Sequence, residues 1–414
     1  MSTLIELIRK NVQRPILRCY IKRRDTAGDY EADWVRIDNW KDKQRVINWG
    51  SVSLEINHHP GQISKFEVSN LTITVDNQEG HFNIETFDNS LWNGYLNRKF
   101  TKLKVEAGYM DTDGTTEIGV ANIFEGVIDK VIITSGLSPI AKINILSYQT
   151  ILKKYDIKDL SLASADRTVE NLHADIMNQS KITKFIPYVA ATPNIANVVI
   201  DDPSTLEGSY WDVLLYLAQI TNSIPKLIGD TWSFTSRTPG VSSAFDFTED
   251  DIYDINSYDD EGADRVRLRF QEEDGATFSV ASDDDLQLKY LGDTTDGSEV
   301  EFVDLSFVKS TNKQSVLDTL VDYWKTPRPL INFTTRFLVN QINPTEKITI
   351  DIEQKTIPAT GIFRLGISKL GGPDVLGKYI GAISISSSDS WMVTRVIKNL
   401  QNWITQIRAE KIIT

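Results

Sequence analysis

The feature that most constrains the fold is a long series of short alternating strands between Trp34 and Leu152. Apolar and polar residues alternate with the period of two that places one face of a strand on a core. Turn residues separate the runs, at Pro60-Gly61, Glu79-Gly80, Asp113-Gly114 and Ser135-Gly136. Regularly spaced short strands with such turns predict a β-barrel or sandwich. The expected strands lie within 46–56, 64–75, 100–110, 123–133 and 140–148.

The run LTITVDNQEGHF, at positions 71–82, shows the pattern most clearly. Leu71, Ile73 and Val75 fall on one face, and Gly80 permits a positive φ in the following turn. We therefore expect a β-hairpin here, with the return strand starting at His81 and Phe82. Nothing in this run by itself indicates catalysis.

Helical periodicity enters after residue 155. Residues 168–180 place Val169, Leu172, Ile176 and Met177 on one helical face, and residues 209–223 form the best helix pattern of the chain. Ser209 and Asp212 have the spacing of a capping box at its start. Residues 223–240 then read as two strands joined by a Gly-Asp turn, so 156–240 is expected to be a small α+β domain.

The acidic charge is concentrated in one segment. Residues 246–304 hold 20 acidic and four basic residues, whereas the rest of the chain holds 37 acidic and 40 basic ones. The simplest interpretation is a set of solvated acidic loops; the alternative is a surface that must not bind nucleic acid or anionic polymers. Either interpretation disfavours DNA or RNA binding, which needs a basic surface.

Strands are expected again from residue 263, with a helix at 312–329 that Pro327 and Pro329 end, and further strands at 347–352, 362–368, 379–387, 391–399 and 403–414. The prediction is a mainly β, multi-domain chain with α+β insertions, in which β-barrel or sandwich domains flank the small α+β domain. The expected segments are an N-terminal helix and strand arm (1–30), a β-barrel-like domain (31–155), the α+β domain (156–240), an acidic β domain with one helix (241–345) and a C-terminal β region that completes the second large β domain (346–414). That the two large β domains are of the tube type is what the family resemblance described below implies.

Composition excludes several classes of site. The single cysteine, Cys19, permits no disulfide within the chain and no cysteine-based zinc or iron–sulfur centre. The adjacent pair His58-His59 points to opposite faces of an extended chain and is expected to be turn residues. No apolar run has the length of a membrane span, and the N-terminus reads as a short amphipathic helix capped by Thr3 and Glu6, not as a secretion signal.

Motifs for chemistry are sparse. The GxSxG, GxxxxGK[ST], GxGxxG and HExxH motifs are absent. Ser310 and Lys313 match SxxK by spacing alone, at the start of an expected helix. The runs Asp111–Glu117 and Ser282–Leu286 could bind calcium, but the first lacks the ligands of an EF-hand and is better explained as a turn. We predict no catalytic residue, no metal site and no cofactor.

The order of residues around the opening run resembles the tail-tip hub proteins of tailed bacteriophages and gene-transfer agents. The resemblance covers roughly residues 45–155 and rests on class-type motifs: Asn77, Glu79, Gly80 and Phe82, then Trp92, then Gly108, then Phe124, Gly126 and Ile128. A weaker resemblance covers 205–350, through the helix at 209–223 with its strand pair and the helix at 312–329. The chain departs from those members that carry a cysteine cluster for an iron–sulfur centre.

The resemblance implies a structural virion protein made in the host cytoplasm. It would form a homo-oligomeric ring, with three copies favoured, that closes the tail tube and contacts tube, tape-measure and tip or fibre proteins while DNA only passes through. Three alternatives remain open at this point: a hexameric distal tail ring, a carbohydrate- or receptor-binding module of the tail tip, and a cytosolic β-rich protein unrelated to phage.

Overall fold

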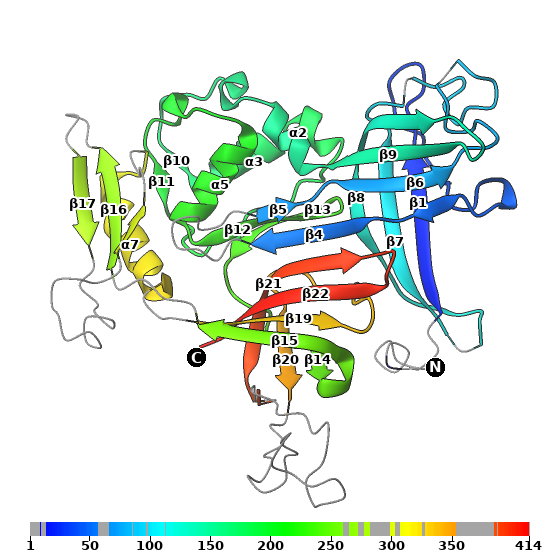
Figure 1. Cartoon of the computed structure of the whole chain (residues 1–414). Helices are drawn as coiled ribbons and strands as arrows, with labels where there is room; N and C mark the ends of the chain where they lie inside the picture. The colour runs from blue at the N-terminus through cyan, green and yellow to red at the C-terminus, as the bar shows by residue number, and fades with distance from the viewer. Residues whose placement is uncertain are drawn as a thin grey trace, which may run out of the picture.

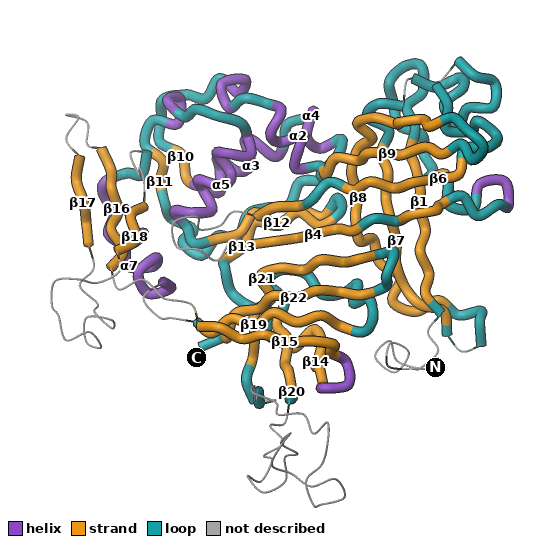
Figure 2. Tube along the Cα trace, in the orientation of Figure 1, coloured by secondary structure: helices purple, strands orange, loops and turns teal. Residues whose placement is uncertain are grey.

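The computed structural model describes residues 9, 14–56, 66–84, 86–96, 98–111, 113–259, 265–271, 277–281, 299–302, 307–324, 328–352, 385–386 and 388–413. Strands dominate, and helices cluster beside one end of the sheets (Figures 1 and 2). The mainly β fold with α+β insertions that the sequence predicts is therefore confirmed. Several predictions fall outside the described residues: the N-terminal helix, the turn at His58-His59, the strand at 362–368 and residues 379–384 of the strand at 379–387.

The first sheet has seven strands, all paired antiparallel, in the order β2-β1-β7-β8-β9-β6-β3. Its strands are β1 (Pro15–Lys22), β2 (Val35–Arg36), β3 (Val46–Asn48), β6 (Leu71–Asp76), β7 (Lys102–Met110), β8 (Glu117–Thr134) and β9 (Ile140–Ser147). In β6, Leu71, Ile73 and Val75 are fully buried and the residues between them are not, as the alternation predicts.

The predicted hairpin at 71–82 is wrong. β6 pairs with β9, where Leu71 faces Ile145, and with the edge strand β3; His81 and Phe82 belong to a turn-rich segment and form no return strand. Gly80 does take the positive φ expected of it, at 72°. A turn signal thus indicates where β6 ends without indicating which strand pairs with it, because β6 finds its partners far along the chain.

The second sheet has eight strands: six lie in the order β14-β20-β21-β22-β19-β15, and β4 and β5 form a hairpin that adds to them along β21. All of its pairs are antiparallel except β14 with β20. Its strands are β4 (Ser51–Ile56), β5 (Phe66–Val68), β14 (Ser243–Thr248), β15 (Ile252–Asp259), β19 (Pro329–Thr335), β20 (Lys347–Asp351), β21 (Ser390–Asn399) and β22 (Ile404–Lys411).

The β4–β5 hairpin joins the two sheets. The chain leaves the first sheet after β3, forms β4 and β5 against the second sheet, and returns to the first sheet as β6. In Figure 1, β4 lies between β6 and β21. The runs predicted as single strands at 46–56 and 64–75 are therefore each split between two sheets. The predicted segment 31–155 supplies strands to both sheets, and the proposed domain boundaries stay a prediction.

The α+β region contains α2 (Gln149–Lys154), β10 (Arg167–Thr168), α3 (Val169–Met177), α4 (Ser180–Thr183), β11 (Val199–Ile200), α5 (Tyr210–Ile220), β12 (Ser223–Ile228) and β13 (Thr231–Ser236). The predicted capping box is present: the Ser209 hydroxyl accepts from Asp212 N, and the Asp212 carboxylate accepts from Ser209 N. All four predicted core residues of α3 are buried.

A third sheet, of β16 (Arg265–Gln271), β17 (Thr277–Ala281) and β18 (Glu299–Phe302), lies beside α7 (Ser310–Trp324) (Figure 1). It confirms the predicted return to strands near residue 263. The side chains of these strands, and with them most of the acidic segment, lie outside the described residues.

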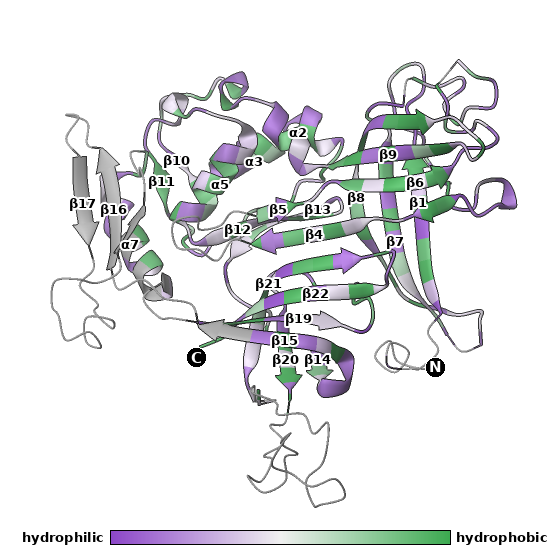
Figure 3. Ribbon diagram, viewed as in Figure 1, coloured by the Kyte–Doolittle hydropathy of each residue, from purple (hydrophilic) through white to green (hydrophobic). Residues whose placement is uncertain are grey.

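Two groups of buried apolar residues form the core. One runs from the first sheet through β4 and β5 to α3 and α5, and the other packs against one face of the second sheet. Figure 3 shows hydrophobic and hydrophilic residues alternating along many of these strands. Each large sheet therefore buries one face and leaves part of its other face exposed.

Candidate assembly surface

The residues that carry the family resemblance pack and hydrogen-bond within the protein core or its turns. Asn77 is buried; its Oδ1 accepts from Phe82 N at 2.9 Å, and its Nδ2 donates to Asn83 Oδ1 at 2.9 Å. Phe82 meets Trp92 edge-on at 6.4 Å between ring centroids, and Trp92 Nε1 donates to Thr101 Oγ1 at 3.0 Å. These contacts fold the segment after β6 back onto the end of the first sheet.

Glu79 belongs to an ion-pair cluster beside the same turn. The guanidinium of buried Arg45 contacts Glu79 at 2.9 Å and Asp76 at 3.2 Å, and Lys43 and His81 also contact Glu79. The hydrogen bond from Lys43, followed by those from Arg45 and His81, lowers the pKa of Glu79 to about 2. The cluster orders the turn, and its carboxylates are already paired, which leaves none poised as a general acid or base.

The two glycines of the resemblance mark close approaches of strands. A Cβ built on Gly126 would lie 2.1 Å from the carbonyl oxygen of Leu146 on β9, and one on Gly108 would lie 2.6 Å from Val120 on β8. Both distances are shorter than any normal contact, so only glycine fits. These positions therefore fix how β7, β8 and β9 pack.

The apex of the β8–β9 hairpin carries exposed apolar side chains. Leu137 is fully exposed, and Ile132 and Ile133 are both more than one third exposed. Ile47, on the edge strand β3, is also exposed. These exposed apolar side chains near one apex make it a candidate contact surface.

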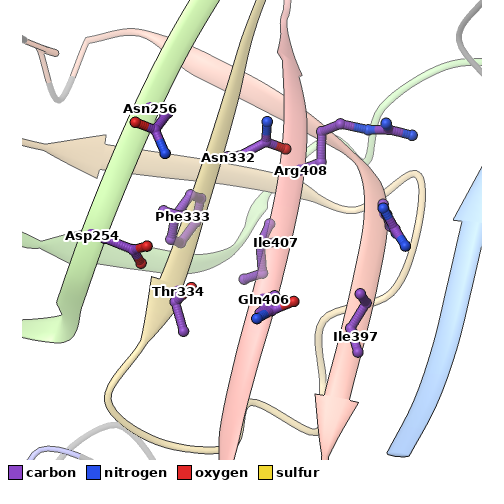
Figure 4. Close-up of a pocket in the computed structure, with 10 residues that line it drawn as sticks. Asp254, Asn256, Asn332, Phe333, Thr334, Ile397, Gln406, Ile407 and Arg408 are labelled. Atoms are coloured by element: carbon purple, nitrogen blue, oxygen red, sulfur yellow. The ribbon is translucent and has the colours of Figure 1, made fainter.

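The exposed face of the second sheet is polar. Glu55 of β4 contacts Arg408 of β22 and lies 3.3 Å from the guanidinium of Arg395 on β21. Beside these arginines a shallow groove of about 320 Å³ crosses four strands (Figure 4). Its lining comprises Asp254, Asn256, Asn332, Phe333, Thr334, Arg395, Ile397, Gln406, Ile407 and Arg408.

The chemistry of the groove is that of a contact surface. Asp254 is the one carboxylate among its lining residues, whereas glycoside hydrolysis uses a pair of them. Phe333, the one aromatic residue in the lining, is buried and packs against Phe247 on the core side of the sheet. The groove thus offers amide, carboxylate and guanidinium groups for hydrogen bonds but no exposed aromatic platform for a sugar.

Of the remaining sequence candidates, the acidic run at 111–117 forms a turn. Asp113 accepts hydrogen bonds from the backbone N–H groups of Thr115 and Thr116, which confirms the turn interpretation of 111–117. These bonds hold the pKa of Asp113 far below its usual range. Among the described residues no group of three or more His, Cys, Asp or Glu side chains has the geometry of a metal site. Ser282–Leu286 lies outside the described residues.

The described part of the chain contains no helix that is both long and apolar enough to cross a bilayer. The exposed β8–β9 apex and the polar groove were not predicted from the sequence. Ile132, Ile133 and Leu137 are visible as apolar residues next to the Ser135-Gly136 turn signal, and that juxtaposition could have identified them.

No protein-family model matches the sequence. No curated protein matches it either. Among solved structures, the tail protein from Neisseria meningitidis MC58 superposes with a TM-score of 0.52 at 9% sequence identity, over 95% of this chain and 96% of that one. The chain has the fold of a tail protein.

Two further structures of similar kind score lower. The prophage tail protein gp18 from Listeria monocytogenes EGD-e has a TM-score of 0.49 at 9% identity, over 94% of each chain. The prophage MuSo2 tail protein from Shewanella oneidensis has a TM-score of 0.49 at 8% identity, over 95% of this chain and 98% of its own. The superposition on the Neisseria meningitidis protein confirms, at the level of the fold, the resemblance to tail proteins that the sequence indicates.

Proposed function

We propose that the chain is a structural virion protein of a tail tip or baseplate. In this proposal it acts as a hub: three copies form a ring that closes the tail tube and connects it to tip or fibre proteins. The tail tube or distal tail protein and the tape-measure protein are the proposed neighbours, and DNA passes through without stable binding. The observation that carries the proposal is the tail-protein fold over 95% of the chain, with two large sheets joined by the β4–β5 hairpin.

The sheet architecture supports a ring of three. Each chain contributes a seven-stranded sheet and a second sheet of six strands extended by β4 and β5, and each sheet buries only one face. Three chains would supply six such sheets, which matches a tube of sixfold symmetry. A ring also suits contacts in which one surface of a copy packs against a different surface of the next copy. When such contacts close into a ring, both surfaces of every copy are covered.

The β8–β9 apex supports contact between copies. Leu137, Ile132 and Ile133 place apolar surface at the end of a hairpin that projects from the first sheet. Covering this surface removes apolar area from water, and each fully buried leucine-sized side chain contributes about 2 kcal/mol. We propose that the apex packs against the neighbouring copy in the ring.

A structural role without catalysis also fits the surface chemistry. The groove on the second sheet holds one carboxylate, and the acidic turn at 111–117 is engaged in its own hydrogen bonds. Incubation of the purified protein with host peptidoglycan and capsular polysaccharide tests this part of the proposal. We expect no release of soluble fragments; measurable cleavage would contradict it.

Substitution at the apex tests the assembly proposal. Leu137→Asp places a charge on the surface that is to be covered, whereas Val241→Asp places the same charge on a fully exposed valine in the loop before β14. We expect the first variant to fold as a monomer and to lose incorporation into tails at least tenfold, and the second to assemble normally. Normal incorporation of Leu137→Asp would rule out the apex as a contact.

A further inference from the structure

The segment of residues 338–346, between β19 and β20, contacts the first sheet directly. The Tyr109 hydroxyl donates to the carbonyl of Leu338 at 2.7 Å. The side-chain amide of buried Asn340 donates to the carbonyl of Ala107 at 2.8 Å and also to that of Gly119. These bonds connect β7 and β8 to a segment that belongs in sequence to the second sheet.

The same segment is held by the second sheet and by the α+β region. Thr345 N donates to the carbonyl of Val393 on β21 at 2.8 Å, and Lys398, further along β21, donates to Asn340 O at 2.8 Å and to Asn343 Oδ1 at 3.1 Å. From β12, Lys226 Nζ donates to Thr345 Oγ1 at 3.0 Å. Residues 338–346 therefore form a joint between three parts of the molecule.

Backbone strain is stored in this joint. Thr345 has a φ of 76°, in the left-handed region that a β-branched residue rarely adopts. Such a conformation persists only where surrounding contacts impose it. Here the contacts are the bonds that Thr345 makes to Val393 and Lys226, so loss of the joint would release the strain.

The amine of Lys398 fits its site in the neutral form. Its side chain is 1% exposed, and its two acceptors among the described residues are both uncharged oxygens. A neutral amine has two N–H donors, which these acceptors satisfy, whereas an ammonium adds a third donor and a charge. Burial lowers the pKa of Lys398 to about 7, against a smaller opposing effect of Glu346. Burial also lowers the pKa of Lys226, which Glu346 likewise opposes.

We propose that residues 338–346 are a latch controlled by protonation of Lys398: the neutral amine holds the two sheets together, and the ammonium form favours an open joint in which Lys398 reaches water. Among the described residues, Glu346, on the segment itself, is the charged group that acts on Lys398 in the closed state. Lys226 faces the same segment from β12, where it donates to Thr345. Opening frees the first sheet to shift relative to the second.

The latch responds to pH between the pKa of Lys398 in the closed joint and its pKa in the open joint. An open joint returns Lys398 to its ordinary pKa of 10.5, so the open state binds more protons than the closed state between pH 10.5 and about 7. The opening constant therefore rises by about tenfold for each pH unit lost in this range. Below pH 7 both states are protonated and the constant levels off, so the latch is most easily opened at neutral and acidic pH.

Hydrogen exchange measured by mass spectrometry tests the latch in the full chain. Protection factors, corrected for the intrinsic pH dependence of exchange, are measured for 338–346 and for α5 at pH 7, 8 and 9. We expect protection of the segment to increase by about tenfold per pH unit while α5 keeps a constant value. Equal protection of the segment at all three pH values would overturn the proposal.

Two variants separate Lys398 from other titrating groups. Lys398→Met retains the packing of the side chain but removes the amine and its two hydrogen bonds to Asn340 and Asn343, so protection of the segment should no longer change with pH. Lys347→Met, at the half-buried first residue of β20, is the matched control and should behave as the wild type. An unchanged pH dependence in Lys398→Met would contradict the latch. If that variant does not fold, the wild-type pH series decides alone.

Discussion

Trp232 donates a hydrogen bond of 2.8 Å from Nε1 to Nε2 of His173, and the two rings stack at 5.9 Å between centroids. The bond requires an unprotonated Nε2, so His173 is the neutral tautomer with its hydrogen on Nδ1. Burial lowers the pKa of His173 to about 4 from 6.5. The contact joins α3 to β13 in the core of the α+β region.

This contact predicts acid sensitivity. The folded state binds fewer protons than the unfolded state between pH 6.5 and about 4, so the stability that neutral His173 contributes is complete above pH 6.5 and is lost as the pH falls to 4. The loss amounts to about 3 kcal/mol. Urea denaturation at pH 7, 6, 5 and 4 measures it.

The matched variant is His173→Phe, which keeps an aromatic ring but cannot be protonated. It is expected to be less stable than the wild type at pH 7, because Trp232 Nε1 loses its acceptor. Its stability should then decrease less between pH 6.5 and 4. An identical pH dependence in both proteins would show that His173 does not titrate in this range.

The burial of Arg45 leads us to expect that its substitution destabilises the fold. Its side chain is 1% exposed and pairs with Asp76 and Glu79. Arg45→Ala removes the cation and leaves Asp76 without its partner, which we expect to cost about 3 kcal/mol. Lys43→Ala removes an exposed cation from the same cluster and should change the unfolding free energy by about 0.5 kcal/mol or less. Equal effects of the two substitutions in denaturant titrations would be inconsistent with a buried Arg45.

The close approach of β9 to Gly126 leads us to expect that any side chain at this position destabilises the fold. An added methyl group at this position would lie 2.1 Å from the Leu146 carbonyl oxygen, so Gly126→Ala must push β8 and β9 apart. We expect a loss of about 2 kcal/mol in the free energy of unfolding. At Gly240 the nearest atom to an added Cβ is 3.6 Å away, so Gly240→Ala serves as the control and should be close to neutral. A tolerated Gly126→Ala would mean that the strand spacing differs from the structure.

Local signals in the sequence were sufficient to predict several helices and strands. The cap at Ser209 and the apolar stripe of α3 were predictable, because capping and helical periodicity depend on residues within a few positions of each other. The alternation of β6 was predictable for the same reason. The tail-protein resemblance rested on residues such as Asn77, Phe82 and Gly126, whose buried contacts explain why those residue types occur there.

Strand pairing was not predictable in the same way. The run at 46–56 alternates throughout, yet β3 pairs with β6 in the first sheet and β4 pairs with β21 in the second. Alternation specifies that a residue faces a core and does not specify which core, and β21, which places β4 in the second sheet, lies more than three hundred residues away. The buried amine of Lys398 was hidden for a related reason, because lysine is ordinarily a surface residue.

The number of copies in the proposed ring is the most direct test of the proposed function. Cryo-electron microscopy of the tail tip, or native mass spectrometry of the isolated ring, gives this number. We predict three copies, with the two large sheets of each chain alternating around the tube in six similar positions. Six copies, or a monomer that occupies the side of the tail without encircling its channel, would contradict it.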